Sequence, residues 1–146
     1  FQVPPSHPFA RYVLQYQSIH EMRVERNAGG MMAFVNLGEA LESLIPEWES
    51  LLPATALRDN RTEVTLVIDR DYYRLRVNRG IIDIAPFAGA NKISLTSAEL
   101  MHLVTGYRYL EDILASRRCI LTADARLLLK TIFPKRHPYV WVFDRF

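Results

Sequence analysis

Few residues of this chain stand at the spacings that enzymes use for catalysis or metal binding. The sequence contains no Cys-x-x-Cys, no His-Glu-x-x-His, no phosphate loop ending in Gly-Lys-Ser/Thr and no Gly-x-Ser-x-Gly elbow. The single cysteine, Cys119, has apolar neighbours, which predicts an inert, partly buried thiol. The four histidines are far apart along the chain, and His102 is expected to be an exposed or hydrogen-bonded imidazole on a helix. The sequence therefore predicts neither a metal site nor a catalytic centre of its own.

Tyrosines and acids are the remaining candidates for proton transfer. Glu111 and Asp112 are adjacent in the sequence and are expected on a solvated helix face, and no two carboxylates are placed for acid–base catalysis by spacing alone. A phenol with an apolar ring more commonly forms the wall of a core or a groove. The tyrosines to which this applies are Tyr72, Tyr73, Tyr107, Tyr109 and Tyr139.

The stretch RNAGGM at residues 26–31 is similar to a cofactor loop. GNAT acetyltransferases hold the pyrophosphate of acetyl-CoA with an Arg/Gln-x-x-Gly-x-Gly/Ala loop at a helix start. Arg26 and Gly29 fit this pattern, but Met31 occupies the last small position and the next segment favours a strand. A glycine-containing hairpin turn is the better interpretation. No cofactor site is therefore expected within these residues.

Size and composition indicate one globular domain. The chain has 146 residues, 49% of them hydrophobic and 23% charged, and a formal net charge of +2. The basic residues are scattered, so nucleic acid is not expected as a partner. No signal peptide or membrane-length apolar run is present, so we expect no membrane partner and a cytoplasmic location. The opening FQVPPSHPF predicts a linker over residues 1–9, which leaves 10–146 as the C-terminal domain of a larger protein.

The first half of the domain favours strands around one helical segment. Residues 11–16, 21–26 and 31–35 are predicted strands, with a turn at 27–30. Apolar residues at three- and four-residue spacing predict helix over 37–52, with Asn36 as N-cap and Glu39 as the capping acid. Pro46 is expected to begin a second helical turn, because proline is poorly tolerated inside a helix.

An alternation of period two follows. It predicts a hairpin of 62–69 and 72–80 around a charged turn, with Tyr73, Leu75 and Val77 on one face and arginines on the other. Residues 81–85 and 92–95 are shorter strands. Thr96 and Glu99 form a capping box that begins a helix, and two further helices lie in 108–117 and 123–133. Strands early and helices late predict an α+β fold.

The last third resembles the sterol-carrier-protein-like C-terminal domain of bacterial GNAT N-acetyltransferases. That similarity covers nearly the whole chain, and more distantly it extends to the enhanced-intracellular-survival aminoglycoside acetyltransferases. Its most specific part is the ending around DRF. The middle agrees at Val35, Leu37, Ala40 and Leu41. The matching positions of the last third are Gly106, Tyr107, Leu110, Phe133, Pro134, Pro138, Trp141, Asp144, Arg145 and Phe146.

This resemblance implies a mixed sheet of about five strands with helices packed on one face. It implies that one or two GNAT domains precede residue 1 and carry the acetyl-CoA site. The activity would be acetyl transfer from the co-substrate acetyl-CoA to the amine of a small molecule or peptide, in a homo-oligomer. The present chain would contain no cofactor, would be inactive alone, and would shape the acceptor side of the active site.

The resemblance implies that the site residues of this chain lie in its apolar ending, PYVWVFDRF. In the better-understood relatives the C-terminal carboxylate reaches the active site, which implies a catalytic role for the carboxylate of Phe146, as a binder of the cationic amine or an acceptor of its proton. Trp141, Asp144 and Arg145 would contact the substrate or orient that carboxylate. Alternatively, the tail packs as a closing strand and the carboxylate faces solvent.

Two other functions remain open from the sequence. A lipid- or sterol-binding carrier would need an unfilled apolar tunnel, which sequence cannot distinguish from a packed core. The third function is a purely structural oligomerisation module. The apolar residues that would either line such a tunnel or, more commonly, fill a core are Leu100, Leu103, Leu127, Leu128 and Ile132.

Overall fold

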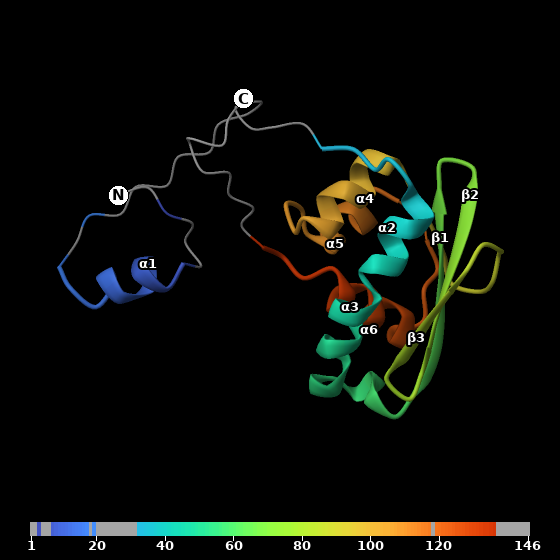
Figure 1. The fold of residues 1–146 in the computed structure, drawn as a ribbon, viewed down its shortest axis with the longest axis horizontal. Coiled ribbons are helices and arrows are strands. Elements are labelled where there is room, and N and C mark those ends of the chain that lie inside the picture. The colour runs from blue at the N-terminus through green and yellow to red at the C-terminus, as the bar shows by residue number, and fades with distance from the viewer. Residues whose placement is uncertain (1–2, 4–6, 18, 20–31, 118, 137–146) are drawn as a thin grey trace.

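The protein, studied as a computed structural model, is described over residues 3, 7–17, 19, 32–117 and 119–136. Within these residues a twisted sheet is covered by helices on one face, as the family resemblance implied (Figure 1). The sheet comprises β1 (Arg61–Ile68), β2 (Asp71–Asn78), β3 (Ile81–Ala85) and β4 (Lys92–Leu95) in the order β3-β2-β1-β4. β1 pairs antiparallel to β2 and parallel to β4. The described sheet is thus mixed and has four strands, against about five expected, and the α+β class is confirmed.

The predicted hairpin is confirmed, together with the faces of its strands. Leu75 and Val77 are fully buried toward the helices, whereas Arg76 on the same strand is exposed on the outer face. The turn from β2 to β3 is made by Arg79 and Gly80, both with positive φ, at 51° and 80°. Two successive positive φ angles match the right-handed twist of a two-residue hairpin.

The helices begin at the predicted caps. The Asn36 side chain accepts from the Glu39 N–H at the start of α2 (Leu37–Ser43), and Pro46 lies in the first turn of α3 (Ile45–Leu51). Two 3₁₀ turns follow, η1 (Leu52–Ala54) and η2 (Ala56–Arg58). Thr96 and Glu99 form the reciprocal capping box of α4 (Ser97–Val104). α5 spans Leu110–Ala115 and α6 spans Ala123–Ile132, with Thr122 as N-cap.

The space between helices and sheet is filled by side chains. The rings of Trp48 and Phe133 meet edge to face, with centroids 5.6 Å apart and planes at 85°. This geometry suits the ring quadrupoles. Leu100, Leu103, Leu128 and Ile132 belong to this core, and Leu127 packs against it half-buried. None of the helices in the described ranges combines the length and apolar character needed to cross a bilayer.

Two predicted strands are wrong. Residues 11–16 were expected to be extended, but α1 (Pro8–Val13) is helical, because Pro8 presets the first turn and the His7 ring accepts from the Phe9 N–H at 3.1 Å. This helix begins inside the predicted linker. The predicted strand at 31–35 also fails, because its described residues 32–35 form no strand. The predicted strand at 21–26 and the turn at 27–30 lie outside the described residues.

The failure at 32–35 has a physical reason, since a strand needs a free sheet edge with which to pair. The N–H of Ile82, on edge strand β3, donates to Glu49 Oε1 at 2.8 Å. On the opposite edge, the Ser94 carbonyl accepts from Arg117. Side chains therefore occupy positions that an added strand would use.

Candidate functional site

A glycine follows the end of α4 and is contacted by a distant segment of the chain. After α4, the Gly106 N–H donates to Leu103 O at 2.9 Å and the Tyr107 N–H donates to His102 O at 2.8 Å. Gly106 has φ of 70°. These are the two hydrogen bonds of a Schellman motif, with glycine in the left-handed position. The Gly106-Tyr107 pair that carries part of the family resemblance is therefore a helix C-cap.

The segment after α6 crosses directly over this cap. The Arg136 N–H donates to Gly106 O at 2.9 Å, and a Cβ on Gly106 would lie only 2.6 Å from the Arg136 nitrogen. The Arg136 guanidinium also pairs with Glu47 on α3. The chain is thus fixed at Arg136, immediately before residues 137–146, by partners on two other elements.

Lys135 adds a cation to two tyrosine rings at the same place. Its Nζ donates to Tyr107 O at 2.6 Å and lies 5.7 Å and 5.5 Å from the ring centroids of Tyr107 and Tyr109. Both rings are about half exposed. A lysine over exposed rings provides a surface that is both cationic and apolar.

Beside Lys135 lies a hollow of about 260 Å³, which we name the α5–α6 hollow. Leu110 and Phe133, both nearly fully buried, contribute its apolar lining, and Lys130 and Lys135 contribute positive charge. Glu111 accepts from Lys130 at 3.0 Å and lies 3.8 Å from Arg126. Two cations, Lys130 and Arg126, therefore flank this carboxylate. The complete lining is Tyr109, Leu110, Glu111, Lys130, Phe133 and Lys135.

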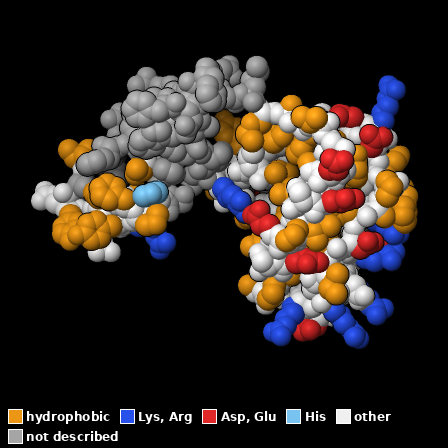
Figure 2. All heavy atoms as spheres, viewed as in Figure 1, with side chains coloured by type: hydrophobic (Ala, Val, Ile, Leu, Met, Phe, Trp, Pro, Cys, Tyr) orange, Lys and Arg blue, Asp and Glu red, His pale blue; other side chains and the backbone are white. Residues whose placement is uncertain are grey.

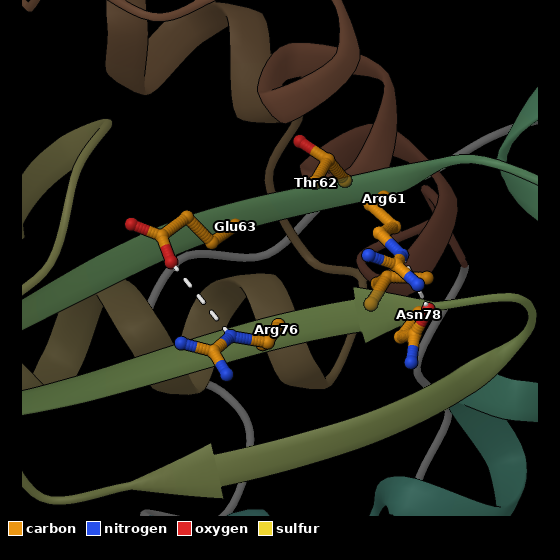
Figure 3. A pocket seen from close by; sticks show the side chains of 6 residues that line it. Arg61, Thr62, Glu63, Arg76 and Asn78 are labelled. Carbon is orange, nitrogen blue, oxygen red and sulfur yellow. Dashed lines mark hydrogen bonds and ion pairs between the residues drawn. The ribbon is translucent and has the colours of Figure 1, made fainter.

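A second hollow, of about 400 Å³, lies where β1 begins and β2 ends (Figure 3). We name it the β1–β2 hollow. In Figure 3 the guanidinium of Arg76 reaches toward Glu63 on the neighbouring strand, and Arg61 reaches toward Asn78. The lining is polar apart from one valine, and it consists of Arg61, Thr62, Glu63, Arg76, Val77 and Asn78.

The sequence-predicted site residues are not brought together within the described residues. Trp141, Asp144, Arg145 and Phe146 lie outside them, as does the glycine stretch at 26–31. His102 is half-buried against the Tyr107 ring, with centroids 5.2 Å apart, and its buried Nδ1 has no partner in the structure as described. No group of three His, Cys, Asp or Glu residues in the described part could hold a metal ion.

Sequence reasoning missed Glu47, Lys135 and Arg136. Arg136 pairs with a residue 89 positions earlier, and Lys135 with a carbonyl 28 positions earlier. The only local signal was a pair of basic residues after the helix-ending Pro134. That signal does not identify their partners.

Comparison with known proteins identifies the fold through structure and not through sequence. No known family's sequence profile matches this chain, and no curated protein matches it in sequence. The solution NMR structure of palmitated SCP2L2 from Aedes aegypti superposes with a TM-score of 0.52 at 16% identity, over 74% of this chain and all of that chain. The fold is sterol-carrier-protein-like. A crystal structure of sterol carrier protein 2 like 2 from the same mosquito aligns with a TM-score of 0.42 at 12% identity, over 66% of this chain and 97% of that chain.

The sterol-carrier-like fold agrees with the architecture expected from the sequence resemblance. The superposition covers 74% of this chain with a TM-score of 0.52. At 16% identity the likeness concerns the fold alone, and the chemistry has to be argued from this chain's own residues.

Proposed function

We propose that this domain binds a lipid through the α5–α6 hollow, as a carrier of the sterol-carrier type. The observation that carries this proposal is an apolar lining of Leu110 and Phe133 beside two lysines. An acyl chain removed from water by such side chains gains about 0.8 kcal/mol per buried CH₂. A lysine beside the same lining can pair with an acidic headgroup. The likeness to the palmitated SCP2L2 fold supports the same function.

The size of the hollow limits what it would enclose. Its volume of about 260 Å³ is somewhat below the range of roughly 300–1,000 Å³ typical of ligand pockets. Phe133, which lines the hollow, also belongs to the buried hydrophobic core. The hollow would therefore cover the headgroup-proximal part of a lipid and leave the rest at the surface.

A displacement assay with a fluorescent fatty acid and palmitate as competitor tests this function. We expect saturable displacement at micromolar palmitate, weakened about tenfold by Lys130→Glu combined with Lys135→Glu. Arg126→Glu is a control for a single charge reversal on the same helix, because Arg126 lies one turn from Lys130 on α6 with similar side-chain exposure, 50% against 55%, and does not line the hollow. No displacement, or equal displacement in the double variant, would contradict the proposal.

A second candidate is the function implied by the sequence resemblance, an accessory domain of an acetyl-CoA-dependent GNAT N-acetyltransferase. One observation favours it. Arg136 is held on Gly106 and Glu47, so the chain leaves the described domain from a fixed point. A fixed origin would limit the positions open to Phe146 and help to present its carboxylate to an amine acceptor.

Two measurements separate this candidate from the carrier. In a full-length enzyme, deletion of Phe146 should lower turnover by at least tenfold while folding is retained, and unchanged turnover would exclude the carboxylate role. Calorimetric titration of residues 1–146 with acetyl-CoA should give no tight binding, because the cofactor loop would belong to a preceding domain. Tight binding to these residues alone would overturn the accessory assignment.

A further inference from the structure

The β1–β2 hollow contains two arginines whose hydrogen-bonding capacity is largely unused. Arg61 Nε donates to Asn78 Oδ1 at 3.0 Å, and Arg76 Nε lies 3.9 Å from Glu63 Oε2. Each guanidinium is thus oriented through Nε. Its two terminal nitrogens have no partner among the described residues, although they carry four of its five N–H donors.

The only carboxylate lining this hollow is already held by the backbone. Glu63 Oε1 accepts from the Ala90 N–H at 2.8 Å, in the loop that crosses the outer face of the sheet. Its other oxygen is 3.9 Å from Arg76, which is beyond hydrogen-bond distance. A bound oxyanion could therefore engage Arg76 without displacing a short ion pair.

The surroundings of the hollow are rich in arginine. The Arg79 N–H donates to Asn60 O at 3.3 Å, which holds the β2–β3 turn against the residues that lead into β1. Arg58 precedes this point, and both Arg58 and Arg79 are exposed. Figure 2 shows basic side chains gathered at the lower end of the domain, where Figure 1 places this end of the sheet. Arg58, Arg61, Arg76 and Arg79 stand against Asp59, Glu63 and Asp83, the last directly opposite Arg76 on β3, which leaves a local excess of one positive charge.

We propose that the β1–β2 hollow binds a phosphate-type oxyanion. Arginine presents planar, fixed N–H donors that match the spacing of phosphate oxygens, so a pair on adjacent strands suits such a group. The amide of Asn78 offers a further donor. The group can be inorganic phosphate or the phosphomonoester of a lipid headgroup, which share this chemistry. The proposal is independent of lipid binding at the α5–α6 hollow, which lies on other elements.

Titration of the full chain with inorganic phosphate and with pyrophosphate at low ionic strength tests the chemistry. We expect saturable binding that Arg61→Gln with Arg76→Gln weakens at least tenfold. The control is Arg70→Gln with Arg126→Gln, which has the same net charge and includes an arginine as exposed as Arg76, 50% against 51%. Glu63→Gln should strengthen binding severalfold, because it removes a negative charge and keeps an acceptor for the Ala90 N–H.

Vesicle sedimentation identifies the source of the phosphate. Vesicles of phosphatidylcholine with phosphatidic acid are compared with phosphatidylcholine alone. Binding to the first only, lost in the Arg61/Arg76 variant, assigns a lipid headgroup, whereas binding of soluble phosphate without sedimentation assigns a free phosphate. The proposal is wrong if neither phosphate, pyrophosphate nor phosphatidic-acid vesicles bind the native chain. It is also wrong if the Arg61/Arg76 variant binds these probes as tightly as its control variant does.

Discussion

The backbone N–H of Arg136 donates to the carbonyl of Gly106 at 2.9 Å, and the two residues approach so closely that no side chain fits between them. A Cβ on Gly106 would stand 2.5 Å from the Arg136 Cβ, and Gly106 has a positive φ of 70°. The α4–α5 connection and the segment after α6 are joined at this point.

Gly106→Ala should therefore destabilise the domain by about 2 kcal/mol or more, because it combines a left-handed backbone with a backbone clash. Urea denaturation followed by far-UV circular dichroism measures this change. The control is Gly38→Ala in α2, where the added Cβ meets atoms only at 3.7 Å and beyond. That substitution should be neutral or stabilise the fold by about 0.5 kcal/mol. Equal effects of the two substitutions would contradict the proposed close contact.

Glu49 on α3 closes one edge of the sheet, where its carboxylate accepts from the Ile82 N–H at 2.8 Å. Glu49→Ala should cost about 1–2 kcal/mol of unfolding free energy, because this N–H loses its acceptor. Glu49→Gln keeps an acceptor and should cost less than half as much. Amide hydrogen exchange at Ile82 should accelerate in the alanine variant alone. Unchanged exchange there would show that water replaces the carboxylate at no cost.

The Glu99 carboxylate should make stability depend on pH in the acid range. Burial raises its pKa, but hydrogen bonds from the Thr96 N–H, Arg117 and the Thr96 hydroxyl outweigh burial, so the pKa lies below its ordinary value of 4.5. A pKa lowered on folding contributes stability that is fully present above the unfolded value. That contribution is lost as the pH falls below about 4.5 toward the folded pKa.

Glu99→Gln should therefore cost about 1–2 kcal/mol at pH 7, and the difference from the native chain should shrink below pH 4.5. Urea denaturation between pH 7 and pH 3 measures both quantities. A difference that stays constant across this range would mean that the charge of Glu99 contributes nothing. Asp112→Asn, at an exposed acid of α5, is the control for loss of a carboxylate charge.

Phe133 links the core to the α5–α6 hollow, since its ring packs edge to face on Trp48 and also lines the hollow. Phe133→Ala should lower the free energy of unfolding by about 3–5 kcal/mol. Phe133→Leu retains most of the apolar volume and should cost clearly less. Denaturation curves for the two variants, compared at equal protein concentration, test this order. A smaller loss for alanine than for leucine would exclude a packing role.

The local signals predicted much of the secondary structure correctly. Asn36 and Thr96 each accept a hydrogen bond from the backbone N–H three residues later. Each cap can therefore be recognised within a short window of sequence. The hairpin faces were equally readable, because alternating side chains point to opposite sides of a strand. The prediction at 11–16 was wrong because a strand-like composition without a pairing edge gives way to a proline-started helix.

The sequence alone determined the α+β class, the capped starts of α2, α4 and α6, and the buried faces of the hairpin, since each depends on residues within a few positions of one another. Only the tertiary structure decided which distant groups meet: Arg136 with Glu47 and Gly106, Glu49 with Ile82, and the lysines with the apolar lining of the α5–α6 hollow. These contacts join segments of the chain through the packing of helices on the sheet. No periodicity along the sequence encodes them, because their geometry exists only after the core has formed.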